Sequence, residues 1–209
     1  MRRALAGAVC LTAACALVHR GTPAGDALRA RRLMVPVAGV SPADVPDTFR
    51  ARRGWRGIHG AVDIVAPRGT PVVSADDGRV LRLRRNGKGG VTLYATDPTQ
   101  RFIYYYAHLQ AYGRGITPGC RLVRGQVIGF VGTTGNAAWR EPHLHFQVMV
   151  RRRGRRLGGE PIDPRPFFVS GGRARCARPG ARDRDLALRP VSEACSGARR
   201  AAARAKEVR

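Results

Sequence analysis

Short apolar runs recur through the middle of the chain, and residues that favour turns separate them. The runs return roughly every 8–15 residues between Pro46 and Phe168, a spacing typical of antiparallel β proteins. The stretches "ADDGRV" and "RNGKGG" have the composition of hairpin turns. The pattern predicts a mostly β domain at 46–170, built as a compact antiparallel β-sheet or sandwich. The runs are "AVDIVAP", "TPVVSA", "GRVLRLR", "GVTLYAT", "RFIYYYAHL", "QVIGFVG" and "HLHFQVMV".

A different apolar pattern occupies the start of the chain. The basic "MRR" precedes the uninterrupted run "ALAGAVCLTAACALV" (Ala4 to Val18). This run suits a secretory signal peptide, and it is short for a membrane-spanning helix. Residues 1–20 are therefore expected to be a signal peptide or a membrane or lipid anchor of an exported protein. Three fates remain open: cleavage at the small-x-small "ACA" (Ala14 to Ala16), lipidation at Cys15, or retention as an anchor.

Both segments that flank the domain lack strand patterning. Residues 21–45 are mixed and basic, which predicts a linker. Residues 171–209 are rich in Arg, Ala and Gly with few large apolar side chains, so a flexible extension without stable structure is expected. Cys176 and Cys195 in this tail could form a disulfide in an oxidising compartment.

The chain is strongly basic, with a formal net charge of +24. Such a charge suits nucleic acid, a membrane surface or an anionic wall polymer. Because Lys88 and Lys206 are the only lysines, arginine supplies nearly all of the positive charge. A GC-rich coding sequence produces the same bias without any ligand. Since no zinc finger, RNP-like aromatic motif or recognition helix is evident, the sequence does not favour a nucleic-acid partner.

Two histidines stand one residue apart at the start of the last apolar run, "HLHFQVMV". Side chains alternate between the two faces of a strand. His143 and His145 should therefore project together, with Leu144 and Phe146 on the other face. Two imidazoles on one face suit a metal site, or a metal ligand beside a catalytic group, although a polar face with two chance histidines gives the same pattern.

Three further residues make a metal site the stronger interpretation. His59 precedes Asp63 by four residues, and His108 ends the run "RFIYYYAHL". A catalytic zinc takes three protein ligands and keeps one position open. His59, Asp63 and one of His143 and His145 supply two imidazoles and a carboxylate, which leaves the other histidine and His108 for acid–base work. The chain has no HExxH motif, so a glutamate base on a helix is not expected.

Four motifs resemble the lysostaphin/LytM-type zinc metalloendopeptidases, which cut peptide cross-links in bacterial peptidoglycan. The similarity extends from about Phe49 to Phe168, and its opening resembles a subgroup from Gram-negative bacteria. The resemblance implies a small, mostly antiparallel β domain of the lysostaphin type, the duplicated hybrid motif, with its site in a groove across the sheet. The motifs are "HGAVDIVAPRGTPVVSADDGRV", "YYYAHL", "GQVIGFVGTTGNA" and "PHLHF".

The resemblance also implies a role for each candidate residue. It implies that His59, Asp63 and His145 bind one Zn²⁺ per chain. His143 is implied as the general base for the attacking water, and His108 as the stabiliser of the tetrahedral oxyanion. We therefore expect 46–170 to be a zinc metallopeptidase domain that hydrolyses peptidoglycan stem-peptide cross-links as a monomer in the periplasm or cell envelope. In a Gram-negative envelope these would be D-Ala to diaminopimelate bonds.

The chain departs from the family pattern near its first histidine. Ala61 stands where the family commonly has Gly, and Gly60 stands where the subgroup often has an acidic residue. Many members also carry an aromatic residue upstream that assists the oxyanion, and neither Phe49 nor Trp55 aligns clearly with it. An alternative function is a non-catalytic regulator that activates other wall hydrolases, because some relatives lose zinc ligands. The complete ligand set here argues against that alternative.

Overall fold

The computed structural model describes the domain and the segment that precedes it. The predictions for residues 1–20 and 171–209, and for the Cys176–Cys195 disulfide, lie outside the described residues. Within the described part of the chain, no helix is both long and apolar enough to cross a membrane. The described ranges are 22–52, 57–137, 141–152, 154 and 157–170.

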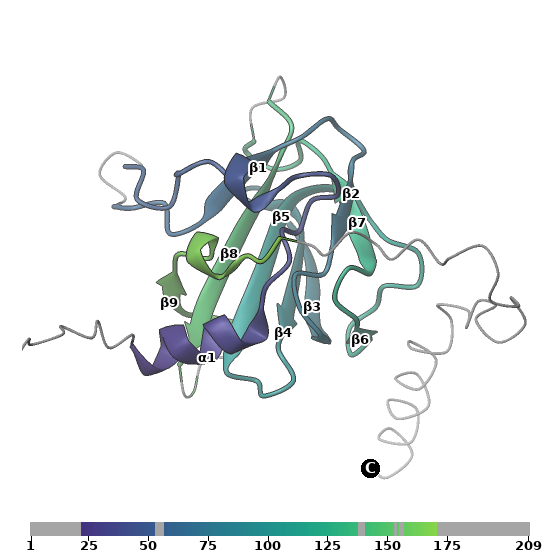
Figure 1. Ribbon diagram of the computed structural model, residues 1–209. Helices are drawn as coiled ribbons and strands as arrows, with labels where there is room; N and C mark the ends of the chain where they lie inside the picture. Colours follow the sequence, from purple (N-terminus) through teal and green to yellow (C-terminus); the bar gives the residue numbers. More distant parts are fainter. Residues whose placement is uncertain (1–21, 53–56, 138–140, 153, 155–156, 171–209) are drawn as a thin grey trace, which may run out of the picture.

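One nine-stranded sheet with antiparallel pairing forms the framework (Figure 1). Its main path runs β1-β8-β5-β4-β3-β6, while β2 and β7 form a branch from β5, and β9 pairs with β8. This arrangement confirms the mostly antiparallel β fold that the apolar runs predict. The strands are β1 (Val62–Val65), β2 (Pro71–Val73), β3 (Gly78–Asn86), β4 (Gly90–Thr96), β5 (Phe102–Tyr112), β6 (Arg121–Leu122), β7 (Val127–Val131), β8 (His143–Arg151) and β9 (Gly159–Ile162).

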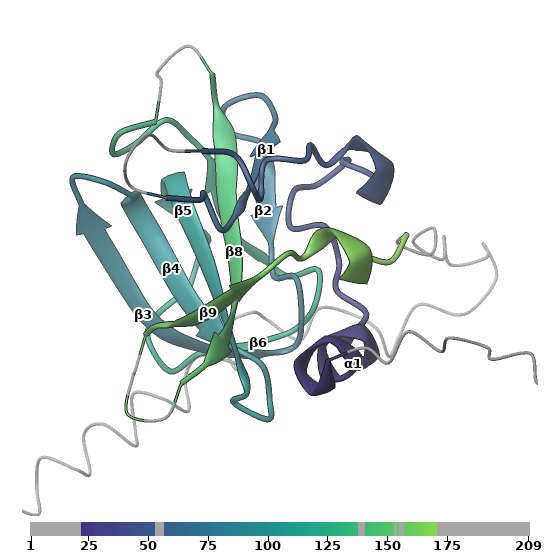
Figure 2. The ribbon, with the colours of Figure 1, turned by 90° about the vertical axis from the view of Figure 1, so that its left-hand side faces the viewer.

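One face of the sheet packs against the core, and the other carries the histidines. On β8, Leu144, Phe146 and Val148 are fully buried, whereas His143 and His145, which alternate with them, are partly exposed. This alternation confirms that the two histidines share a face. Figures 1 and 2 show α1 (Pro23–Arg31) and the 3₁₀ turn η3 (Arg165–Phe167) together on one side of the sheet, where they cover the apolar face.

Residues 22–45, within the stretch predicted as a linker, pack into this core. The Thr22 hydroxyl caps α1 by accepting a hydrogen bond from the Gly25 N–H at 3.1 Å. Leu28 from the helix and Leu33 from the segment after it have no exposed surface. The short 3₁₀ turn η1 (Pro42–Asp44) then leads toward the sheet. These residues are therefore part of the folded domain, and the physical unit begins well before the predicted boundary at residue 46.

A buried carboxylate fastens α1 to the sheet. The Asp76 side chain has no exposed surface and accepts hydrogen bonds from Arg31 Nε at 2.6 Å and Arg31 Nη2 at 2.9 Å. The Tyr104 hydroxyl donates a third bond at 2.8 Å. The bond to Asp76 raises the pKa of Arg31, and burial, followed by the charge of Asp76, raises the pKa of Tyr104. At neutral pH the cluster thus holds a buried ion pair with a neutral tyrosine.

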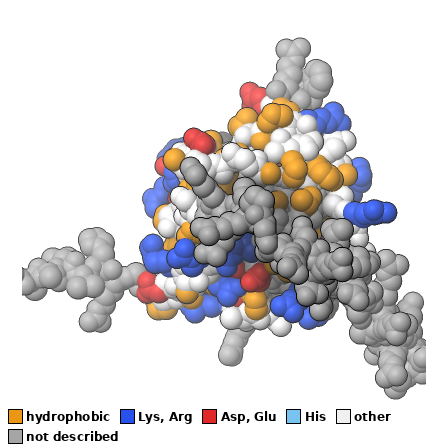
Figure 3. Space-filling view, turned by 45° about the vertical axis from the view of Figure 1, so that its right-hand side comes forward, with side chains coloured by type: hydrophobic (Ala, Val, Ile, Leu, Met, Phe, Trp, Pro, Cys, Tyr) orange, Lys and Arg blue, Asp and Glu red, His pale blue; other side chains and the backbone are white. Residues whose placement is uncertain are grey.

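Basic side chains are spread over the face of the protein that Figure 3 shows. In the view of Figure 3, Lys and Arg side chains are distributed around the molecule, with a few acidic side chains between them. Arg82, Arg84 and Arg85 are exposed along β3, and Arg152 is exposed beyond the end of β8. On the face shown, this distribution fits a composition bias better than a nucleic-acid interface.

Candidate metal centre and active site

Side-chain atoms of three residues lie close together where β1 pairs with the start of β8. Nε2 of His59 lies 3.0 Å from Nδ1 of His145, and Oδ1 of Asp63 lies 2.9 Å from Nδ1 of His145 and 3.3 Å from Nε2 of His59. Asp63 and His145 are direct partners across the β1–β8 pair, which places their side chains on one face. His59 reaches the same point from the loop before β1.

Thr48 holds two of these residues in place. Its carbonyl oxygen lies 3.0 Å from Nδ1 of His59, so that nitrogen donates its proton there and Nε2 presents a lone pair to the cluster. The Thr48 hydroxyl accepts a hydrogen bond from the Asp63 N–H at 2.9 Å. Sequence reasoning did not identify Thr48 as a site residue, because Thr48 acts partly through its backbone and lies outside the four motifs.

The donor set fits a zinc ion. Burial opposes ionisation of Asp63, but hydrogen bonds from His145 and His59 outweigh it and hold its pKa well below the ordinary range. An ionised carboxylate and two imidazole nitrogens therefore point at one place, within 4.8 Å of one another. Without a metal, protons on the imidazoles can bridge these atoms, and two imidazoles with one carboxylate are ligands that zinc prefers in their place.

His143 flanks the cluster on the same strand as His145. Its Nδ1 lies 2.8 Å from the Glu141 carbonyl oxygen, and its Nε2 lies 3.9 Å from Oδ1 of Asp63. Donation of the Nδ1 proton to the carbonyl leaves Nε2 as an acceptor on the side of the cluster. The side chain is 14% exposed, so water can reach it.

His108 faces the cluster because β5 bulges. Val91 of β4 pairs with Leu109 of β5, and Leu93 of β4 pairs with Tyr106 of β5. The two pairs are two residues apart on β4 and three residues apart on β5. One extra residue on β5 reverses the alternation of side chains at that point. His108 itself has a φ of 60°, in the left-handed region. Without the bulge it would point into the core, opposite to Ala107.

The bulge brings the His108 ring 5.0 Å from that of His143 and 5.7 Å from that of His145, centroid to centroid. Nδ1 of His108 lies 2.7 Å from the Thr134 carbonyl oxygen. Burial, followed by the nearby His143 and His145, lowers the pKa of His108 to about 4, although the bond to Thr134 acts in the opposite direction. At neutral pH, His108 is therefore a neutral imidazole whose Nε2 can accept a proton.

All five predicted site residues thus lie together on one face of the sheet. Of the two upstream aromatic candidates, Phe49 is buried in the core, and Trp55 lies outside the described residues. Ala61 is fully buried, so the departure from Gly at this position is accommodated by packing.

A cavity of about 210 Å³ opens beside His108 and His145. Tyr105 forms part of its wall, and its ring meets that of His145 edge-on at 5.9 Å. Sequence alternation could have identified Tyr105, because it lies two residues before Ala107 and therefore faces the same way. The described residues that line the cavity are Lys88, Gly89, Tyr105, Ala107, His108, Asn136 and His145.

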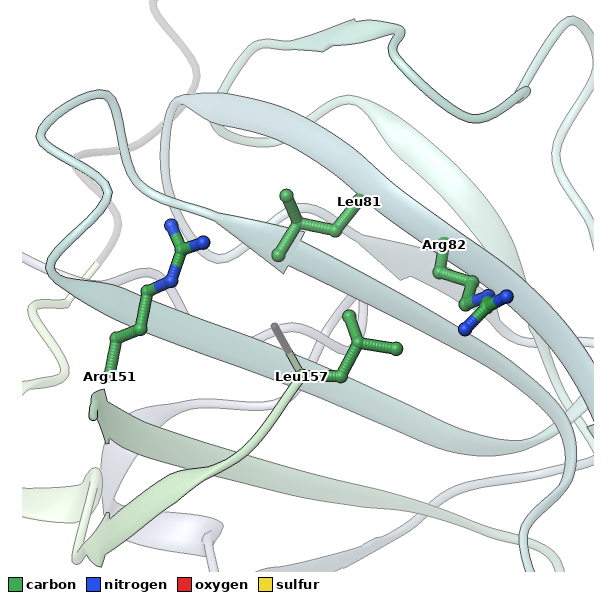
Figure 4. Close-up of a pocket in the computed structure, with 4 residues that line it drawn as sticks. All are labelled: Leu81, Arg82, Arg151 and Leu157. Carbon is green, nitrogen blue, oxygen red and sulfur yellow. The ribbon is translucent and has the colours of Figure 1, made fainter. Parts of the chain in front are cut away.

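The same face of the sheet continues away from the histidines. Arg82, Tyr94, Tyr105 and Gln147 form a cross-strand row, so their side chains share this face. At its far end, a second cavity of about 320 Å³ has Leu81 and Leu157 between Arg82 and Arg151 (Figure 4). It shares no described lining residue with the histidine cluster.

Comparison with known proteins gives the chain a clear set of relatives. The profile of peptidase family M23 matches residues 57–164. The chain is 34% identical over 113 residues to the DD-carboxypeptidase/endopeptidase Mpg of Neisseria meningitidis, covering 53% of this chain and 22% of Mpg. It is 36% identical over 118 residues to the peptidoglycan DD-endopeptidase ShyC of Vibrio cholerae, covering 53% of this chain and 26% of ShyC.

Solved structures show the same likeness. LytU superposes with a TM-score of 0.52 at 30% identity, covering 61% of this chain and 84% of LytU. A zinc-containing peptidase from Vibrio cholerae superposes with a TM-score of 0.50 at 26% identity, covering 67% of this chain and 40% of that protein. The chain spans about a quarter of the length of the two curated relatives.

Proposed function

Because the chain belongs to peptidase family M23, we propose that it is a zinc-dependent endopeptidase that hydrolyses peptide cross-links of bacterial peptidoglycan. One observation carries the proposal. Two histidines and an aspartate converge as a metal ligand set, and two further histidines flank that set with proton-accepting nitrogens toward it.

His59, Asp63 and His145 would hold one zinc ion. A bound zinc ion polarises the scissile carbonyl and makes water a better nucleophile at neutral pH. The protein contributes the orientation of the ligands: Thr48 fixes the ring of His59, and cross-strand pairing fixes Asp63 against His145.

His143 is the general base in this proposal. With Nδ1 directed at the Glu141 carbonyl oxygen, Nε2 is the nitrogen left to take a proton from the attacking water and return it to the leaving amine, and the side chain is partly open to water. The single N–H of neutral His108 is directed at the Thr134 carbonyl oxygen, so Nε2 must first receive a proton before it can donate a hydrogen bond to the tetrahedral oxyanion. Its buried position keeps that second proton weakly held.

The substrate is a stem-peptide cross-link in peptidoglycan. Mpg and ShyC are named for cleavage of bonds between D-amino acids, and we propose the D-Ala to diaminopimelate bond for this chain. We place the protein as a monomer in the periplasm or cell envelope, with residues 1–20 as signal peptide or anchor.

Loss of cross-linked muropeptide dimers, followed by mass spectrometry, tests the function. We expect the purified protein to cleave dimers, a chelator to abolish cleavage, and His145→Ala to be inactive. Glu160→Ala, which changes an exposed residue on β9, is the matched control and should remain active. A protein that binds zinc yet leaves dimers intact would overturn the proposal in favour of a regulator of other wall hydrolases.

A further inference from the structure

One strongly basic residue lines the cavity beside the histidines. Among its described lining residues, Lys88 is the only lysine or arginine, and none is aspartate or glutamate. His145, one of the proposed metal ligands, and His108 both line the cavity. A water occupies about 30 Å³ of liquid, so about 210 Å³ has room for one small amino-acid residue.

The backbone that carries Lys88 is fixed against the catalytic face. Its carbonyl oxygen accepts a hydrogen bond from the Asn136 N–H at 2.9 Å, and its N–H donates to the Asn86 side chain at 3.0 Å. The next residue, Gly89, accepts a bond from the His108 N–H at 2.8 Å. The backbone of Lys88 is therefore held in one position relative to His108, and the exposed side chain starts at the edge of the cavity.

Close packing explains why this loop is rich in glycine. Gly90 has a φ of +66°, and a Cβ there would lie 2.1 Å from the Thr134 hydroxyl oxygen. That hydroxyl accepts a bond from the Val91 N–H at 2.9 Å and donates to the Leu109 carbonyl at 2.8 Å. The loop with Lys88 and the loop with Thr134 are thus fastened to each other beside the His108 bulge.

The bond proposed above as the substrate carries an anion beside the reacting atoms. In diaminopimelate, each carbon that bears an amine also bears a carboxylate. A D-Ala to diaminopimelate bond therefore has a carboxylate on the carbon attached to the leaving nitrogen, unless that carboxyl is amidated. An ordinary mid-chain peptide bond, or a bond within a glycine bridge, has no charge at that place.

Resting on the proposed function, we propose that Lys88 binds the carboxylate on the amine side of the scissile bond and so determines specificity for cross-links that carry it. The ammonium group would hold the leaving residue in the cavity, with its nitrogen toward His143 and His108. A charge-assisted hydrogen bond of this kind changes affinity by roughly 10- to 100-fold.

Matched substrates and variants test the inference in the zinc-loaded, full-length protein. The substrates are cross-linked muropeptide dimers whose amine-side diaminopimelate carboxyl is either free or amidated. We expect the wild type to prefer the free carboxylate by about 10- to 100-fold in kcat/KM, mainly through KM. Lys88→Gln should lose that preference, and Lys88→Arg should keep it. Arg82→Gln removes one positive charge from the same face outside this cavity and should also keep it.

An unchanged preference in Lys88→Gln, or an equal loss in Arg82→Gln, would overturn the assignment while leaving the peptidase function intact. Calorimetric titration of diaminopimelate peptides, free and amidated, gives a readout independent of cleavage. If no dimer is cleaved, selective binding of the free acid by wild type but not by Lys88→Gln would still support the inference. Binding that does not distinguish the two proteins, or no binding at all, would overturn it.

Discussion

Replacing Asp76 with alanine should destabilise the protein more than replacing any exposed carboxylate. The substitution leaves the guanidinium of Arg31 and the hydroxyl of Tyr104 without their shared acceptor. Removing one partner of a buried ion pair costs about 3–5 kcal/mol of unfolding free energy. At roughly 2–4 °C per kcal/mol for a chain of this size, the melting temperature should fall by roughly 6–20 °C.

Urea unfolding, followed by far-ultraviolet circular dichroism at a fixed zinc concentration, measures the difference. Glu160→Ala is the matched control, because the Arg152–Glu160 pair is 65% and 72% exposed and an exposed pair contributes at most about 1 kcal/mol. Combining Asp76→Ala with Arg31→Met should cost less than the sum of the single changes, since both break the same pair. A loss of no more than about 1 kcal/mol for Asp76→Ala, equal to that of Glu160→Ala, would refute the idea that this cluster fastens α1 to the sheet.

Three further outcomes are expected. Thr48→Val should weaken zinc binding by roughly 10-fold in a competition titration, because the Asp63 N–H loses its acceptor, whereas unchanged affinity would remove Thr48 from the site. In the metal-free protein, the folded-state pKa of His108 is about 4, below its ordinary 6.5, so the contribution of His108 to stability is present above pH 6.5 and is lost as pH falls toward 4. The unfolding midpoint of His108→Gln should therefore depend less on pH than that of the wild type across this window. An equal dependence in the two proteins would contradict the lowered pKa. Gly90→Ala should lower the melting temperature by several degrees, since it adds a Cβ 2.1 Å from the Thr134 hydroxyl oxygen at a positive φ, and an unchanged melting temperature would show that the two loops can separate freely.

Strand alternation predicted the fold class and the shared face of His143 and His145. It could not predict the orientation of His108, because a simple two-residue period places that side chain in the core. The extra residue on β5 that reverses the alternation cannot be recognised from the pattern of apolar residues, because the run that leads up to it is apolar throughout. The small number of histidines made His108 a candidate for acid–base work, and the resemblance to a known family gave it a role at the oxyanion, but the strand period did not place it beside the other histidines.

The role of residues 22–45 also escaped the sequence. The helix α1 buries only Leu28, so it has no repeating apolar face that would distinguish it from a basic linker. Its contribution comes from a long-range ion pair with Asp76, 45 positions further along the chain. Interactions of this kind depend on the assembled fold, and a reading of local pattern cannot reveal them.

The segment that matches the family profile is shorter than the segment that packs into one hydrophobic core. The family profile covers residues 57–164, yet Leu28, Leu33 and Phe168, which lie outside it, belong to the same hydrophobic core. A truncated protein cut at the profile limits would expose the apolar face that α1 and η3 cover. Domain boundaries taken from the family profile alone would therefore leave out part of the folded unit. A truncated protein that keeps the whole core needs the chain from about Thr22 through Val169.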